Sequence, residues 1–112
     1  MNTITYDQFS AVDIRIGTVV RAEPFPEARK PAHKVWVDFG VEYGIRQTSA
    51  QITVHYAPNE LIGRQVLGCL NLGPKKIAGF SSEFLLLGFP DVSGAIVLAG
   101  ATHSVPNGTK IC

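Results

Sequence analysis

The sequence predicts an all-β fold built from five principal strands. Three observations support this: several short segments alternate apolar and polar residues, the connections between them are rich in glycine and proline, and no long segment has helical apolar spacing. The 112 residues include 11 glycines and 7 prolines, which are common in turns. This pattern is compatible with a closed barrel and with a two-sheet sandwich, and periodicity alone does not choose between them.

The first two predicted strands flank a rigid loop. Residues 12–23 form a long strand, bent at Gly17, with one apolar side made of Val12, Ile14, Ile16, Val20 and Ala22. Residues 24–33 contain three prolines and are expected to form a loop. The second strand, residues 34–39, turns Val35, Val37 and Phe39 to one face and Trp36 to the other.

The later elements are shorter. Residues 45–54 predict a third strand, and residues 56–63 predict one or two helical turns that cap the barrel, with Pro58 at the start and Gly63 at the end. Residues 64–72 and 84–89 are apolar on both faces, which indicates strands buried on both sides, one side being covered by a second subunit. Residues 73–82 are expected to be a loop, and Pro106-Asn107-Gly108 a turn before a final short strand.

Composition indicates one globular domain over residues 1–112. We expect its strand core at about 12–89 and extensions at 1–11 and 90–112, and the strands apolar on both faces together with the apolar tail after them predict that the extensions form a homodimer interface. Hydrophobic residues make up 46% and the formal charge is +1, so nucleic-acid binding would require local clustering of Lys and Arg. We expect Cys69 and Cys112 to be free thiols in a reducing compartment. With no membrane-spanning or leader-like segment in the sequence, we expect a cytoplasmic location and no membrane insertion.

The sequence lacks a recognisable catalytic or metal-binding motif. Residues 79–83 miss the nucleophile-elbow pattern because Glu83 stands where a glycine is required, and residues 73–76 lack the phosphate-loop spacing. The three histidines, His33, His55 and His103, are far apart and are expected to be exposed in loops. We therefore expect a binding protein without a metal or cofactor, and not an enzyme.

Several segments together resemble one protein family. They are FPEARKPAHK (25–34), VDFGVEYGI (37–45), QTSAQIT (47–53), PKKIAGFSSEFLLLG (74–88) and VPNGTKI (105–111). In order and spacing, over nearly the whole chain, they are similar to the CsaA family of export-related chaperones, which belongs to the tRNA-binding superfamily with the oligonucleotide/oligosaccharide-binding (OB) fold.

The resemblance implies a five-stranded OB fold, a Greek-key β-barrel with short helical segments, in a homodimer. It implies a cytoplasmic chaperone that binds unfolded or presecretory polypeptides in connection with protein export, and a possible tRNA ligand, since related domains bind tRNA. The family pattern matches Arg29, Lys34, Gln47, Ser49, Gln51, Ile77, Gly79, Phe80, Ser82 and Glu83. The chain departs from the tRNA-binding relatives at residues 82–85, where Ser-Glu-Phe-Leu replaces a Ser-x-Gly-Met-like segment, and Lys30 lies outside the family pattern.

In an OB barrel the ligand lies across strands two and three, between the loop that joins strands one and two and the loop that joins strands four and five. The predicted peptide- or nucleic-acid-binding residues from these segments are Phe25, Arg29, Lys30, Lys34, Trp36, Arg46, Gln47, Ser49, Lys75, Lys76, Phe80 and Ser82. Phe25, Trp36 and Phe80 would be exposed anchors. Two plainer interpretations stay open: Trp36 in the core or at a dimer contact, and the lysine pair as ordinary loop residues in solvent.

Two binding functions are favoured after this argument, and an enzyme is the third and least favoured interpretation. A chaperone would hold unfolded chains in apolar grooves with basic rims, whereas a tRNA-binding protein would stack bases and neutralise phosphates on the same surface. The two differ in their response to salt, because only phosphate neutralisation gives a steep dependence of affinity on salt concentration.

Overall fold

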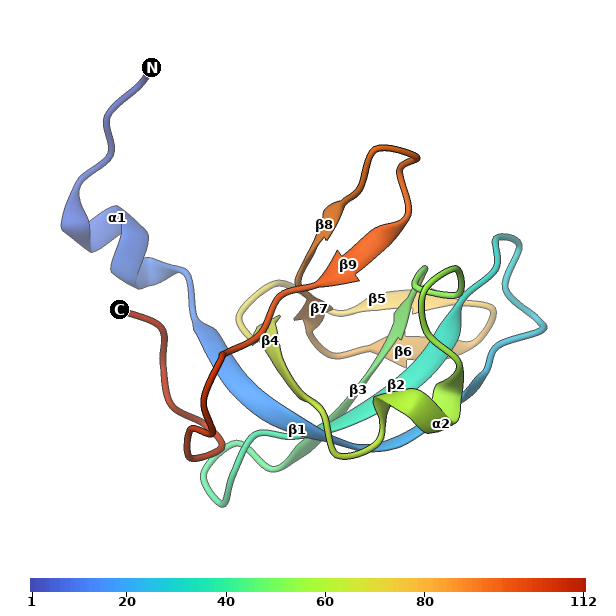
Figure 1. The fold of residues 1–112 in the computed structure, drawn as a ribbon. Helices are drawn as coiled ribbons and strands as arrows, with labels where there is room; N and C mark the ends of the chain where they lie inside the picture. The colour runs from blue at the N-terminus through green and yellow to red at the C-terminus, as the bar shows by residue number, and fades with distance from the viewer.

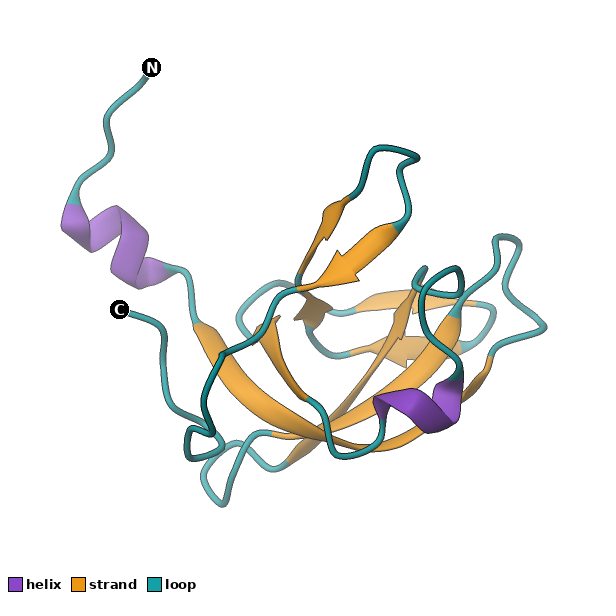
Figure 2. Ribbon diagram, in the orientation of Figure 1, coloured by secondary structure: helices purple, strands orange, loops and turns teal.

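Strands make up most of the regular structure, and the two helices are short (Figure 2). The computed structural model describes residues 1–112. In chain order the elements are α1 (Tyr6–Ala11), β1 (Ile14–Pro24), β2 (His33–Asp38), β3 (Ile45–Ala50), α2 (Pro58–Leu61), β4 (Gln65–Cys69), β5 (Lys75–Ile77), β6 (Phe80–Ser82), β7 (Leu85–Leu86), β8 (Gly88–Pro90) and β9 (Ile96–Leu98).

The longest strand, β1, organises the sheet because it pairs with both β2 and β4. The antiparallel order is β3-β2-β1-β4-β7, so β4 lies beside β1 after the chain has passed through β2 and β3. This return to the first strand is the Greek-key arrangement. The curved sheet nearly closes on itself (Figure 1), and the predicted OB barrel is confirmed.

The core lies inside the barrel, and the alternation predicted for β2 is confirmed. Val35, Val37 and Phe39 are each 0% exposed, while Trp36 lies on the opposite face. Packing is tight where strands cross. A Cβ atom at Gly68 of β4 would come within 2.8 Å of the Phe39 ring and 2.7 Å of the Phe84 ring, so only glycine fits there. The remaining core residues are Val19, Ile52, Leu61, Val66 and Leu70.

The prediction of a single apolar side for residues 12–23 is wrong, because different sets of alternate residues face the core in the two halves of β1. Val20 was expected to face the core, but its side chain is 41% exposed, and Val19 is buried instead. A β-bulge separates two halves of the strand: before it Gly17 and Val19 face the core, and after the register shift between Val19 and Arg21 the even-numbered Ala22 packs against the core instead. One extra residue in a strand reverses the direction of every side chain that follows.

The predicted short helix is confirmed as α2, which begins at Pro58 and covers one end of the barrel (Figure 1). The Glu60 carboxylate accepts a hydrogen bond from the Ala57 amide at 2.8 Å, which satisfies one free donor at the helix start. Leu61 is 0% exposed and anchors the helix in the core. Gly63 follows with a φ of 86°, and its amide donates to the Val19 carbonyl of β1.

The expectation of a loop at residues 73–82 is wrong in part, because these residues contain a β-hairpin. β5 and β6 pair in antiparallel register, with Ile77 opposite Phe80. The two turn residues, Ala78 and Gly79, have φ angles of 48° and 80°. Two central residues with positive φ make the tight turn that suits the twist of a hairpin.

The expectation of one strand buried on both sides at residues 84–89 is also wrong. The strand is interrupted at Leu87, so that β7 belongs to the barrel and β8 pairs with β9 in a hairpin that projects from it (Figure 1). Phe84 is buried, but Leu85 is 50% exposed and Phe89 is 66% exposed. These apolar side chains therefore lie on the surface of the isolated chain.

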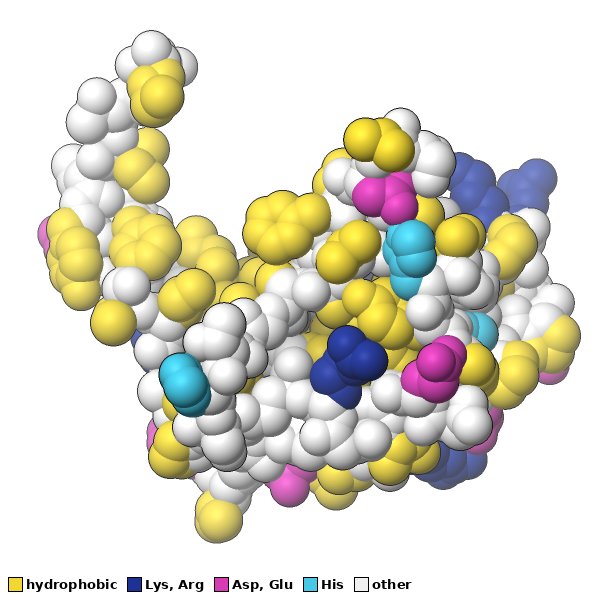
Figure 3. Space-filling view, viewed as in Figure 1, with side chains coloured by type: hydrophobic (Ala, Val, Ile, Leu, Met, Phe, Trp, Pro, Cys, Tyr) yellow, Lys and Arg dark blue, Asp and Glu magenta, His cyan; other side chains and the backbone are white.

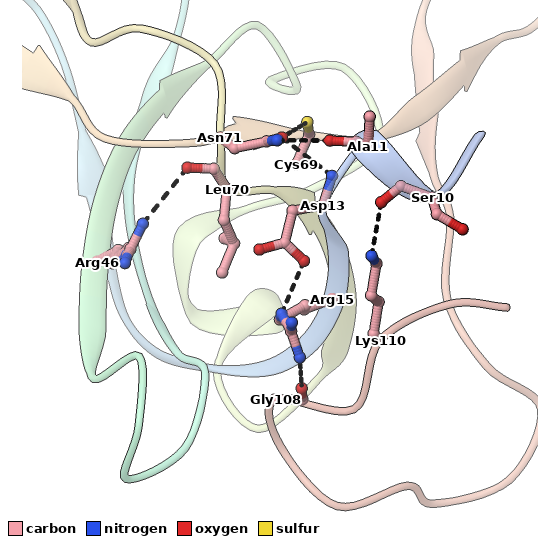
Figure 4. A network of polar contacts seen from close by, with 10 residues as sticks. All are labelled: Ser10, Ala11, Asp13, Arg15, Arg46, Cys69, Leu70, Asn71, Gly108 and Lys110. Carbon is pink, nitrogen blue, oxygen red and sulfur yellow. Dashed lines mark hydrogen bonds and ion pairs between the residues drawn. The ribbon is translucent and has the colours of Figure 1, made fainter. Parts of the chain in front are cut away.

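Both ends of the chain are tied to the barrel by a network of polar contacts (Figure 4). Asn71 donates to the Ala11 carbonyl at 2.6 Å and accepts from the Asp13 amide at 2.9 Å. Lys110 donates to the Ser10 carbonyl at 2.7 Å. Beyond these contacts α1 stands away from the barrel and has no buried residue (Figure 1). Neither helix has the length and hydropathy of a membrane span.

Candidate functional site

The loop after β1 and the β5–β6 hairpin meet over the outer face of β2, as the sequence predicted. Their contact is an aromatic cluster of Phe25, Trp36 and Phe80. The Phe80 ring lies 5.5 Å from Phe25 and 5.9 Å from Trp36, centroid to centroid, with interplanar angles of 63° and 81°. These edge-to-face geometries are favourable for aromatic pairs.

Two cations cover the aromatic cluster. The Arg21 guanidinium lies 4.3 Å from the centre of the Trp36 ring and also pairs with Glu23 at 2.9 Å. The Lys34 ammonium lies 4.7 Å from the Phe25 ring centre and 5.0 Å from that of Phe80. Sequence analysis assigned Lys34 to the site and missed Arg21, whose position opposite Trp36 depends on the bulge in β1.

The expected exposure of the three aromatic anchors is wrong for Phe25, which is only 3% exposed. Its ring is enclosed by Phe80 and Lys34 and supports the surface from below. Trp36 and Phe80 are half-buried. The cluster therefore presents ring edges and two cations to solvent, and Phe25 stabilises that arrangement without forming its surface.

Arg46 does not join this surface, and its expected position is also wrong. Residues paired across an antiparallel ladder point to the same face, and Arg46 pairs with the core residue Val37. Its guanidinium instead donates to the Tyr43 carbonyl at 3.3 Å. It also donates to the Leu70 carbonyl at 3.4 Å, at the end of the barrel (Figure 4). The outward-facing neighbours on β3 are Gln47 and Ser49, opposite Trp36 and Lys34.

Gln47, Ser49 and Ser82 join β3 to the β6–β7 segment. The Gln47 amide donates to the Glu83 carboxylate at 3.0 Å, its carbonyl accepts from the Glu83 amide at 2.8 Å, and its side chain donates to the Ser81 carbonyl at 2.9 Å. The Ser49 amide donates to the Ser82 hydroxyl at 3.0 Å. In this chain, these predicted binding residues hold the barrel closed at one end of the seam between β3 and β7.

Beyond these bonds the seam widens into a groove with a volume of about 840 Å³. Its apolar lining comes from the β3 end, β7 and β9, with Ile52, Phe84, Leu86 and Ile96 among its residues. The full lining is Ala28, Arg29, Lys30, Ala32, Thr48, Ser49, Ala50, Gln51, Ile52, Leu72, Gly73, Lys75, Ile77, Ser82, Phe84, Leu85, Leu86, Leu87, Gly88 and Ile96. We call the aliphatic part of this lining, Ile52, Leu85, Leu86 and Ile96, the aliphatic floor. Sequence analysis assigned Leu85 and Leu86 to a buried strand and therefore missed it.

The rim of the groove is basic. Arg29, Lys30 and Lys75 are exposed and line it, and its lining contains no Asp or Glu. Lys76 was predicted to act with Lys75, but it lies on the opposite face of the β5–β6 hairpin: Lys75 pairs with the lining residue Ser82, whereas Lys76 pairs with Ser81. An extended anionic or polar ligand in the groove would therefore meet Lys75 and not Lys76.

Two of the three histidines, His33 and His55, have structural contacts, and His103 is exposed as expected. His33 was expected in an exposed loop, but it is 7% exposed and its Nε2 lies 2.8 Å from the Tyr56 carbonyl. His55 pairs with Asp91 of the β8–β9 turn at 2.6 Å. Hydrogen bonds from His55 and then Ser93 hold the pKa of the Asp91 carboxyl well below its ordinary value. No three His, Cys, Asp or Glu side chains gather as metal ligands.

Comparison with known proteins gives consistent matches in sequence and structure. Residues 14–110 match the family model described as "Putative tRNA binding domain". The methionine–tRNA ligase of Methanothrix thermoacetophila is 42% identical over 108 residues, which are 96% of this chain and 15% of the ligase. The Bacillus subtilis ligase is 35% identical over 108 residues, 96% of this chain and 16% of the ligase. The chain therefore spans about one-sixth of the length of these ligases.

Two solved structures match the chain from end to end. Chaperone CsaA from Bacillus anthracis is 47% identical, with a TM-score of 0.91, over 99% of this chain and 100% of that one. The CsaA chaperone protein from Picrophilus torridus is 41% identical, with a TM-score of 0.89, over 98% and 100%. With the fold, the family match and these full-length identities in agreement, the chain belongs to the tRNA-binding-domain family of OB folds and, within it, to the CsaA proteins.

Proposed function

We propose that this chain is a non-catalytic, CsaA-like chaperone that binds unfolded or presecretory polypeptides in the groove, in connection with protein export. The observation that carries the proposal is the groove itself, an aliphatic floor with three cations on its rim and no acidic residue. Two structures similar over their whole length are named chaperones. We also propose that it acts in the cytoplasm and as a homodimer.

An aliphatic floor suits ligands of many sequences. Burying one leucine- or phenylalanine-sized side chain contributes about 1.5–3 kcal/mol and requires no directional contact. Leu85, which lines the groove, is 50% exposed and so offers apolar surface to a ligand. The rim cations sit on long flexible side chains that can follow acidic groups at several positions. Folded proteins bury most of their apolar side chains, so this groove favours chains that have not yet folded.

Lys75 and Lys76 provide a test of polypeptide binding in the groove, because only Lys75 lines it. With a fluorescently labelled, unstructured peptide containing leucines and glutamates, Lys75→Ala should weaken binding about twofold to fivefold, which corresponds to about 0.4–1 kcal/mol for a partly exposed ion pair. Lys76→Ala removes the same charge on the other face of the hairpin and should leave affinity unchanged. Fluorescence anisotropy titrations measure both.

A further variant tests the aliphatic floor of the groove. Leu85→Asp places a carboxylate among apolar groups on an already exposed position and should abolish binding of the same peptide. Equal effects of Lys75→Ala and Lys76→Ala, or full binding by Leu85→Asp, would argue against the groove as the polypeptide site.

A second candidate function is tRNA binding, favoured by the family match and by the cations over the aromatic cluster. If four phosphates of a single-stranded region are neutralised, the logarithm of affinity should fall with the logarithm of salt concentration with a slope of roughly −3. Binding of an apolar peptide should change little with salt. Titration of labelled tRNA at several salt concentrations measures the slope, and failure of tRNA to bind at low salt would eliminate this candidate.

The homodimer proposal is supported by apolar side chains on the surface. Tyr6 of α1 is 72% exposed, and Phe89 and Val97 of the β8–β9 hairpin are 66% and 40% exposed. Figure 3 shows hydrophobic side chains along the N-terminal arm and on the projecting hairpin. Contiguous exposed apolar surface on a small protein commonly marks an interaction site.

A further inference from the structure

We propose that a bound polypeptide adds as an extended β-strand in the seam between β3 and β7. This inference rests on the proposed polypeptide-binding function and specifies its mode and ligand class. The preferred ligand is a segment in which apolar side chains alternate with acidic ones. The apolar side chains would face the aliphatic floor, and the acidic ones would face Arg29, Lys30 and Lys75 on the rim.

The sheet is open at this seam. β3 and β7 are its two edge strands, and no ladder joins them. Side chains bridge the seam at one end, where the Thr48 hydroxyl donates to the Phe84 carbonyl at 2.8 Å and Ser49 bonds to Ser82. Past Ser49 the two edges become the walls of the groove. An edge strand with free main-chain groups is a template for a further strand.

The β3 edge turns alternate main-chain groups toward the seam. The Gln47 amide and carbonyl both bond to Glu83 across the seam, and the Ser49 amide bonds to Ser82. Gln51 comes next in this alternation, is exposed and lines the groove. Its amide and carbonyl make no hydrogen bond within the chain. Gln51 therefore supplies one donor and one acceptor to a ligand strand.

The β7 edge has the same property. Leu85 pairs with Cys69, and the Leu87 amide donates to the Leu67 carbonyl at 2.9 Å, so the odd-numbered residues turn their amides toward β4. The pair between Leu86 and Gly68 is therefore the non-hydrogen-bonded kind, and the Leu86 amide and carbonyl point away from β4, into the seam. Phe84, two residues earlier, already points its carbonyl at β3.

The lining also selects the ligand's charge. Three cations and no acid line the groove, so acidic side chains along the ligand are attracted and basic ones repelled. Main-chain bonds supply affinity without regard to sequence, and the alternating floor and rim supply the preference. Because the main-chain hydrogen bonds do not depend on the ligand's sequence, the groove can accept many different unfolded segments.

The test compares two peptides with identical side chains. The parent alternates leucine with glutamate and serine, and the second carries an N-methyl group on every other residue, which removes half of its amide donors. Strand addition predicts that methylation weakens binding roughly tenfold or more, since each lost main-chain hydrogen bond contributes about 1 kcal/mol. Anisotropy with wild type, Lys75→Ala and Lys76→Ala gives the affinities.

The outcomes separate this inference from the function on which it rests. Equal binding of both peptides, with Lys75→Ala still weakened, overturns strand addition and leaves the polypeptide function intact. Failure of the parent peptide to bind at all overturns both.

Amide hydrogen exchange gives a second readout. The amides of Gln51 and Leu86 should exchange slowly only when the parent peptide is bound, while that of Lys76 should be unaffected. If they are protected without peptide in proportion to protein concentration, a second copy of the chain occupies the seam and the proposal is wrong. Protection by tRNA alone would assign the seam to nucleic acid, which also overturns it.

Discussion

The indole ring of Trp36 lies between a charged and an aromatic neighbour on the outside of the barrel. The Arg21 guanidinium covers one face of the ring, and the Phe80 ring packs against it at a steep angle. The core lies on the other side of β2, where Val35 and Val37 are fully buried. At the residue scale, Trp36 therefore belongs to the surface of the molecule, and its packing energy comes from two partners.

Truncation of Trp36 should consequently affect stability less than truncation of a core ring. We expect Trp36→Ala to lower the free energy of unfolding by about 1–2 kcal/mol and Phe39→Ala, the matched core change, by about 3–5 kcal/mol. Urea denaturation of both variants measures the difference. A loss for Trp36→Ala as large as that for Phe39→Ala would mean that the ring supports the core.

At the scale of the element, β2 and α2 could be predicted because each depends on local chemistry. Strict alternation buried Val35, Val37 and Phe39, and Pro58 and Gly63 marked the start and end of the helical turn. The β5–β6 hairpin was missed because its turn uses Ala78 in a left-handed conformation, where Asn or Gly is the usual residue. The bulge in β1 depends on pairing with β2, which no local pattern records.

The candidate site was also predicted only in part, because the sequence indicates where a loop lies but not which face of a paired strand a side chain occupies. Arg29, Lys30 and Lys75 were predicted and do share one rim, because their loops were placed correctly. Lys76 and Arg46 were assigned to the wrong faces, since face depends on a register that only the paired strands define. Phe25 was expected at the surface, although Phe80 and Lys34 enclose it. The aliphatic floor was not predicted, because Leu85 and Leu86 suggested a continuous buried strand.

At the scale of the whole molecule, the barrel leaves two apolar surfaces exposed, α1 and the side of the β8–β9 hairpin that carries Phe89 and Val97. α1 has no buried residue, and the contacts that hold its end come from Ser10 and Ala11. The arm before Ser10 therefore adds little to the stability of the single chain. In the proposed homodimer its apolar side chains would pack against the partner chain.

Removal of residues 1–9 should separate assembly from folding. We expect the intact chain to sediment at twice its monomer mass at micromolar concentration and the shortened chain to shift toward the monomer. Its thermal transition should remain cooperative, because the bonds to Ser10 and Ala11 are retained. Analytical ultracentrifugation and circular dichroism measure the two properties. An intact chain that sediments as a monomer would contradict the homodimer.

The pairing of β1 with the C-terminal segment affects how the molecule is made. The Ile16 amide donates to the Thr109 carbonyl at 3.1 Å, and the Ile111 amide donates to the Ile14 carbonyl at 2.9 Å. These partners are separated by almost the whole chain, so translation must reach residue 111, and the ribosome tunnel must release it, before β1 acquires all its neighbours. Until then the nascent barrel carries an unfinished edge, so a protein proposed to shield unfolded chains is itself incompletely folded until residue 111 has left the ribosome.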